Sequence, residues 1–170
     1  MKKLISIFVA ISLLISVIMF SGCSKRLINS TIHCDSINFA MKEGDDEEFL
    51  RLVSDKKFNL NQYDALKIFE FFEGIRRTPL QETCYLENPY YVEKLLENGA
   101  DPNVILPRGR TCLIDIVALN PKYYNEYHYE IVRLLVEYGT DISIKDQDGF
   151  AAYDYAVKYN RTELYDLLKP

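Results

Sequence analysis

One segment of the chain, residues 78–103, constrains the fold more than any other because it carries a full set of helix start and stop signals. Thr78 can cap the amide groups of a first helical turn, and Pro79 stands where a missing N–H costs nothing. Gly99 follows two leucines, as expected of a glycine in the left-handed conformation that ends a helix. A Glu-Asn-Pro break at residues 87–89 divides the segment. The pattern therefore predicts two short helices followed by a tight turn.

These signals return further along the chain, which indicates internal repetition. A shift of 33 residues places the Thr-Pro-Leu start at 78–80 on Thr-Cys-Leu at 111–113. A shift of 40 places the Gly-Ala-Asp turn at 99–101 on Gly-Thr-Asp at 139–141. The additional seven residues are assigned to the loop between the two helices of the later unit.

The residues of the central unit resemble the ankyrin repeat family. Residues 78–81, Thr-Pro-Leu-Gln, are similar to the Thr-Pro-Leu-His start of that repeat, and residues 95–103 match its Leu-Leu-x-x-Gly-Ala-Asp-x-Asn end. Gln81 replaces the histidine, and Glu87 stands where the family has a turn glycine. The resemblance covers about residues 37–169 and implies an all-α fold, an ankyrin-repeat solenoid of stacked helix pairs with short hairpin fingers.

The resemblance divides the chain into about four repeats with one interruption. The expected repeats are residues 37–61, 78–103, 111–143 and 148–170, and residues 62–77 form a helix-like insertion. A single helix pair buries too little apolar surface to offset its ordering entropy, so neighbouring repeats are expected to share one core. The leucines and isoleucine expected in that core are Leu80, Leu95, Leu96, Leu113, Ile116 and Leu135.

The first 22 residues differ in kind from the rest of the chain. A basic start, Lys2-Lys3, precedes an apolar run that ends at small residues, which is typical of a signal peptide. Residues 20–23, Phe-Ser-Gly-Cys, resemble a bacterial lipoprotein signal, with Cys23 as the lipidated (palmitate-bearing) residue and residues 23–36 as a tether. By resemblance to lipoproteins, Ser24 next to the cysteine implies a location in the cell envelope at the outer membrane, facing the periplasm, where a second membrane exists. An uncleaved N-terminal anchor is the alternative.

The charge balance argues against nucleic acid as a partner, because the formal net charge is −5 and loss of the leader lysines would make it more negative. The sequence lacks a Ser-His-Asp signal, a glycine-rich phosphate loop and a zinc helix motif, so neither an enzyme nor a cofactor is expected. No metal site or small-molecule substrate is inferred. Cys84 and Cys112 fall within helix patterns and are expected to be packing residues, whereas Cys34 lies outside any repeat unit.

Two irregular segments leave alternatives open. The insertion at 62–77 either packs on its neighbours as an extra helix or extends the binding face. Residues 121–129, Pro-Lys-Tyr-Tyr-Asn-Glu-Tyr-His-Tyr, are expected to form a loop. Its tyrosines either lie on adjacent helices or provide a contact surface with a large area and a polar tip.

In ankyrin proteins the usual contact surface is made by the fingers and by the exposed side of each first helix. The resemblance and the tyrosine loop therefore imply a partner-binding surface for an unknown protein. Its expected residues are Gln81, Glu82, Tyr85, Val104, Ile105, Leu106, Arg108, Arg110, Ile114, Asp115, Tyr123, Tyr124, Tyr127, Lys145, Asp146 and Gln147. A membrane-tethered protein-binding module is the leading hypothesis. An immunity protein that neutralises a toxin or effector and an accessory factor for an envelope enzyme are the alternatives.

Overall fold

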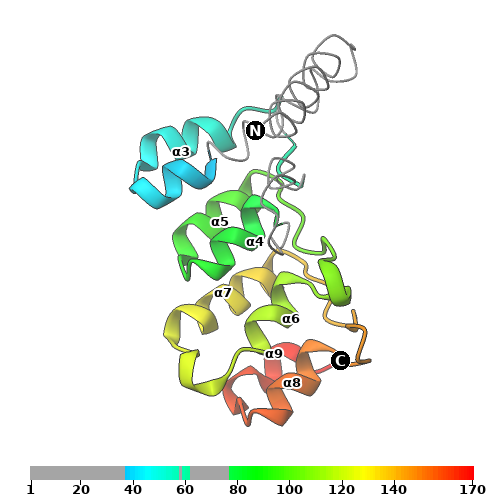
Figure 1. Ribbon diagram of the computed structural model, residues 1–170. Helices are drawn as coiled ribbons and strands as arrows, with labels where there is room; N and C mark the ends of the chain where they lie inside the picture. Colours follow the sequence, from blue (N-terminus) through cyan, green and yellow to red (C-terminus); the bar gives the residue numbers. More distant parts are fainter. Residues whose placement is uncertain (1–36, 58, 62–76) are drawn as a thin grey trace, which may run out of the picture.

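Helices arranged in successive pairs make up the chain wherever the structure, a computed structural model, describes it, at residues 37–57, 59–61 and 77–170 (Figure 1). The first pair consists of residues 37–43 and α3 (Asp46–Val53). The later pairs are α4 (Pro79–Tyr85) with α5 (Pro89–Glu97), α6 (Cys112–Val117) with α7 (Glu126–Glu137), and α8 (Ala152–Lys158) with α9 (Tyr165–Leu168). Short 3-10 turns lie at η2 (Pro107–Gly109), η3 (Pro121–Tyr123) and η4 (Thr162–Leu164). Within the described ranges no residue is in a β-strand, and the all-helical prediction is confirmed.

The pairs stack on one another in chain order, from the blue end to the red end of the colour scale in Figure 1. The first helices form one row, in which α6 packs between α4 and α8. The second helices form another row, in which α5 packs against both α3 and α7. Because α6 also contacts α7, the two rows enclose a continuous apolar layer between them.

The helix boundaries of the central unit follow from their caps. The hydroxyl of Thr78 accepts a hydrogen bond from the Gln81 amide at 3.3 Å, and the Gln81 side-chain oxygen accepts one from the Thr78 amide at 2.8 Å. This reciprocal pair satisfies two amides at the start of α4. At the start of α5 a single bond forms the cap, in which the Asn88 side chain accepts from the Tyr91 amide at 3.3 Å. Helix α4 starts after Thr78, α5 starts after Asn88, and Gly99 after α5 has a left-handed φ of 91°. The predicted start, break and stop of this unit are therefore confirmed.

The core contains all six residues expected from the repeat pattern. Leu80, Leu95, Leu113 and Leu135 are 1% exposed or less, and Leu96 and Ile116 are also buried. Cys84 and Cys112 are buried as predicted. Thr83 occupies a fully buried position, and its hydroxyl donates to the Pro79 carbonyl at 2.7 Å. This hydrogen bond within α4 satisfies the Thr83 hydroxyl, which would otherwise be an unpaired polar group in the apolar core.

The expected loop at 121–129 is shorter than the sequence suggested. Helix α7 begins at Glu126, so Tyr127, His128 and Tyr129 belong to its first turn. Asn125 caps this turn by accepting hydrogen bonds from the amides of Tyr127 and His128 at 3.0 and 3.3 Å. The asparagine cap is the local signal that starts the helix, and it lies inside the tyrosine-rich segment.

Side-chain hydrogen bonds connect the turns that follow the second helices. Asn61 accepts a hydrogen bond from the amide of Asp101 at 2.7 Å, and Asn103 accepts one from the amide of Asp141 at 2.8 Å. Within a turn, the Asp101 carboxylate accepts from the Asn103 amide at 2.8 Å. We call this set the finger ladder, comprising Asn61, Asp101, Asn103 and Asp141. It fixes the spacing of successive units outside the apolar core.

Several expectations from the sequence lie outside the described residues. These are the signal peptide at 1–22, the lipidation of Cys23, the tether at 23–36, Cys34, and residues 62–76 of the insertion. In the remainder of the chain, no helix combines the length and the apolar character needed to cross a bilayer.

Candidate functional site

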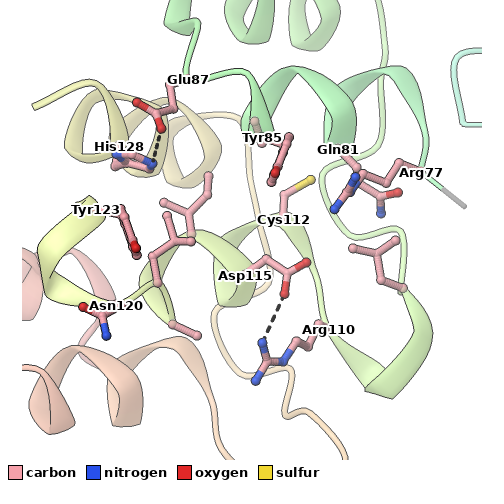
Figure 2. Close-up of a pocket in the computed structure, with 15 residues that line it drawn as sticks. Arg77, Gln81, Tyr85, Glu87, Arg110, Cys112, Asp115, Asn120, Tyr123 and His128 are labelled. Atoms are coloured by element: carbon pink, nitrogen blue, oxygen red, sulfur yellow. Dashed lines mark hydrogen bonds and ion pairs between the residues drawn. The ribbon is translucent and has the colours of Figure 1, made fainter. Parts of the chain in front are cut away.

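A groove with a volume of about 780 Å³ runs along the first helices α4 and α6 (Figure 2). The loops after these helices, the finger at 104–111 and the start of α7 complete its walls. Its lining residues are Arg77, Gln81, Cys84, Tyr85, Glu87, Leu106, Arg110, Cys112, Asp115, Ile116, Ala118, Leu119, Asn120, Tyr123 and His128.

The floor of the groove is largely apolar and is fixed by hydrogen bonds to the finger. Leu106 and Ile116 are buried beneath it. The Gln81 side-chain nitrogen donates to the Val104 carbonyl at 3.1 Å, while the oxygen of the same amide caps α4. One glutamine therefore joins the start of the helix to the finger of its own unit.

Two buried thiols contribute to this floor from neighbouring helices. Cys84 lies near the end of α4 and Cys112 at the start of α6. Contact with the Cys84 thiol, together with burial, raises the pKa of Cys112 well above its ordinary value. Cys112 therefore remains a neutral thiol at physiological pH, consistent with a packing role.

An arginine and a tyrosine form one side of the groove. The guanidinium carbon of Arg77 lies 4.6 Å from the centre of the Tyr85 ring, and an Arg77 nitrogen lies 3.5 Å from the Glu82 carboxylate. Glu82 is also 3.6 Å from the ammonium group of Lys42 on the first unit. Tyr85 itself is 66% exposed, so its ring presents a large apolar surface at the mouth of the groove.

A second arginine connects the groove to the following unit. Arg110 donates to Asp115 at 3.3 Å and to the Tyr155 hydroxyl at 3.1 Å, and lies 3.5 Å from Asp146. Tyr155 also donates to Asp146 at 2.6 Å. Although burial opposes this, hydrogen bonds from Tyr155 and from two backbone amides lower the pKa of Asp146 below its ordinary value. Burial raises the pKa of Asp115, against the opposing effect of Arg110.

The opposite end of the groove is built around Glu87, as Figure 2 shows. This residue has a φ of 57°, and its carboxylate accepts a hydrogen bond from the Asn125 side chain at 2.8 Å. The carboxylate also lies 3.7 Å from Nε2 of His128. His128 is 2% exposed, and burial lowers its pKa despite the opposing effect of Glu87. The imidazole is therefore mostly neutral at pH 7.

A buried stack supports the wall at 119–124 from behind. The guanidinium carbon of Arg161 lies 3.6 Å from the centre of the Tyr124 ring, whose other neighbour is His128 at 5.3 Å between ring centres. Arg161 also donates to the carbonyl of Leu119. Burial raises the pKa of Tyr124 to about 12. The last unit thus holds the loop that forms the groove wall.

The structure brings six of the expected partner-binding residues into the groove, namely Gln81, Tyr85, Leu106, Arg110, Asp115 and Tyr123. Glu82 lies beside it, and Tyr127 is exposed on α7. The remaining finger residues, Val104, Ile105, Arg108, Lys145 and Gln147, do not line it. Tyr124 is partly buried and packs against the core.

Five of the expected residues are buried where exposure was predicted. Glu82 is 9% exposed because it lies against Lys42 and Arg77. Gln81, Leu106 and Asp146 are 4%, 5% and 7% exposed because each holds a finger or turn in place. Ile114 is 1% exposed because α6 is packed by α4, α7 and α8 on three sides. Sequence patterns gave no indication that Arg77, Glu87, Asn120 and His128 line the groove. The one usable local signal was the Asn125 cap, which places His128 in the first turn of α7.

Comparisons with known proteins agree with the stacked helix pairs. A family model described as ankyrin repeats, in three copies, matches residues 80–169. An ankyrin repeat-containing protein of Treponema pallidum is 26% identical over 132 residues, which is 78% of this chain and 39% of that protein. An ankyrin repeat protein of Rickettsia felis is 31% identical over 75 residues, or 44% of this chain and 32% of that protein. The matches therefore span well under half the length of each relative.

Proposed function

Because the chain belongs to the ankyrin repeat family, we propose that it is a protein-binding module that holds a segment of a partner protein in the groove along α4 and α6. Ankyrin repeats in general serve as protein–protein interaction modules without catalytic activity, and we propose the same for this chain. The chain spans well under half the length of each relative, so this proposal concerns the module and not the function of a whole relative.

The observation that carries the proposal is the pairing of exposed aromatic rings with a buried floor. Tyr85 is 66% exposed and Tyr123 is 63% exposed, and both line the groove. Exposed tyrosines beside a preformed apolar depression are typical of binding hot spots, since the rigid ring gives a large contact area. The partly buried hydrogen bonds of Gln81 and of Arg110 hold the walls in place before a partner arrives, which reduces the entropic cost of binding.

Substitution of the two tyrosines tests this proposal. A Tyr85→Ala/Tyr123→Ala variant is expected to weaken capture of the partner by tenfold or more, roughly the effect of losing a hot spot of 1.4 kcal/mol. Tyr138→Ala is the matched control, because Tyr138 is also exposed but follows α7 outside the groove. Capture by chemical crosslinking, with quantification of the bound protein, gives the readout. Equal capture by both variants and the wild type would contradict a binding role for the groove.

We also propose that the module is tethered to a bacterial cell envelope through a lipid on Cys23, facing the periplasm where an outer membrane exists. The support is the leader pattern at residues 1–23. Cells fed radiolabelled palmitate should label the wild type and not a Cys23→Ala variant. Label that survives this substitution would remove the proposed anchor.

The proposed partner is a foreign toxin or effector, which the module would neutralise, or a resident envelope enzyme. The acidic balance of the chain, with a formal net charge of −5, supports the first class because it favours association with a basic protein. Identification of the captured protein separates the two: a nuclease, peptidase or pore-forming toxin indicates immunity, and a resident enzyme indicates an accessory role.

A further inference from the structure

We infer that the segment held in the groove is an extended, basic peptide, with arginine or lysine side chains between apolar ones. This inference rests on the proposed protein-binding function and specifies the chemistry of the partner. It is carried by the difference in accessibility between the acidic and basic side chains of the groove.

The arginines of the groove are already engaged by the chain itself. Arg110 is 23% exposed and contacts Asp115, Asp146 and Tyr155. Arg77 is 24% exposed, and its guanidinium lies between Glu82 and the ring of Tyr85. An acidic partner would have to displace these contacts before it could pair with either arginine, so the arginines are poor binding sites for a carboxylate.

The carboxylates are more accessible and have unused acceptor capacity. The side chains of Asp115 and Glu87 are 42% and 43% exposed. Asp115 accepts a hydrogen bond from Arg110 through Oδ1, and its Oδ2 accepts none from any residue that the structure describes. Burial raises the pKa of this carboxyl, and Arg110, Arg77 and Arg108 act in the opposite direction. A cation of the partner that binds Oδ2 directly would further offset the effect of burial.

Glu87 offers a similar site at the other end of the groove. One of its oxygens accepts from Asn125, which orients the carboxylate, and the nearby His128 is buried and mostly neutral. Glu87 has a left-handed backbone, a conformation that usually carries glycine. A carboxylate therefore lines the groove at a position that would carry no side chain with glycine. The two acidic residues thus line one groove, together with Tyr85 (Figure 2).

The exposed rings are suited to the same occupant. Tyr85 and Tyr123 each carry a cation of the chain near the ring, Arg77 at 4.6 Å and Lys122 at 5.5 Å from the ring centre. A tyrosine ring has two faces, so the second face can receive the stem of a lysine or the plane of an arginine. Side chains that combine an apolar stem with a cation fit both the rings and the carboxylates.

Selection from a displayed library of random linear peptides tests the inference, with the purified full chain as bait. The selected peptides are expected to be enriched in arginine and lysine. The affinity of a selected peptide, measured by fluorescence anisotropy, should fall by about tenfold or more in Asp115→Asn/Glu87→Gln and on replacement of its arginines by citrulline. Glu137→Gln, an exposed position on α7 outside the groove, is the matched control and should leave the affinity unchanged.

The outcomes separate this inference from the proposed function. Selected peptides that are acidic or uncharged, and that lose affinity in Tyr85→Ala/Tyr123→Ala, would overturn the basic chemistry while supporting a protein-binding groove. Basic peptides that bind all groove variants and the control equally would overturn the site. A library that yields no peptide sensitive to any groove variant would contradict both the inference and the function. Thermal melts of each variant establish that a lost affinity is not a lost fold.

Discussion

Glu87 illustrates how a single residue can conflict with its local backbone. Its φ of 57° lies in the left-handed region, which costs a residue with a Cβ about 1 kcal/mol or more relative to glycine. The side chain is nevertheless held by Asn125 and points into the groove. Strain retained at a position that lines a candidate binding site is consistent with selection for the side chain.

Two substitutions at this position separate backbone strain from side-chain contacts. Glu87→Gly and Glu87→Ala both remove the carboxylate, but only glycine relieves the left-handed strain. We expect the glycine variant to be more stable than the alanine variant by about 1 kcal/mol, as measured by urea unfolding. Equal stabilities would show that the backbone at 87 is unstrained in solution.

His128 makes the stability of the fold sensitive to mildly acidic pH. Burial lowers its pKa in the folded state, and the facing charges act in opposite directions, Glu87 raising it and Arg161 lowering it. Below the unfolded value, about 6.5, the unfolded chain therefore takes up a proton before the folded chain does. This contribution to stability is fully present above that pH and is lost as the pH falls toward the folded pKa.

The expected result is a lower urea midpoint for the wild type at pH 5.5 than at pH 7.5, with the fall reduced in His128→Gln. Acidic groups also titrate near the lower end of this range, so the comparison between the two proteins isolates the histidine. An identical fall in both would exclude His128 as its source.

At the scale of elements, the helices were predictable because their signals are local. Thr78, Pro79 and Gly99 mark boundaries by backbone chemistry alone, and each lies where the pattern placed it. The start of α7 is the exception: the tyrosine cluster predicts a loop through residue 129, whereas the local asparagine cap starts the helix at Glu126.

The groove could be predicted only in part, since its composition depends on contacts between units. Tyr85, Arg110 and Asp115 were expected from the repeat pattern, and they line it. Glu87 and His128 lie 41 residues apart and meet only when α7 packs beside the loop after α4. The burial of Ile114 likewise reflects packing by three neighbouring helices, which no period within one unit reveals.

The finger ladder is a contact between elements, and its contribution to the unfolding free energy can be measured by substitution. Asn103→Ala removes the oxygen that accepts from the Asp141 amide, and we expect a loss of about 0.5–1.5 kcal/mol in unfolding free energy. Faster hydrogen exchange at the Asp141 amide should accompany it. Asn98→Ala is the control, since its side chain donates to the Lys94 carbonyl within its own unit. An unchanged exchange rate at the Asp141 amide in Asn103→Ala would show that this ladder bond does not stabilise the fold.

Across the whole molecule, stability depends on units that share one core. Leu95 is fully buried on α5, which packs against α3, α4 and α7. Leu95→Ala should lower the unfolding free energy by about 2–5 kcal/mol. The melt should also remain a single transition, because a defect in the central unit affects both neighbours. Leu86→Ala, at a position 38% exposed, is the control, and an unchanged melt for Leu95→Ala would refute the core assignment.

The finger ladder also has a direction, which gives the array a polarity. At both joints of this kind that the structure describes, an asparagine oxygen of one turn accepts a hydrogen bond from the backbone amide of the following turn. The unit before the joint therefore supplies the side-chain acceptor, and the unit after it supplies the backbone donor. At the corresponding position of the next turn stands Ser143, whose hydroxyl donates to Asp141 of the same turn. Units of this type could therefore be duplicated or exchanged in the same orientation without redesign of the joint. A duplication after residue 143 would require an asparagine there to continue the series.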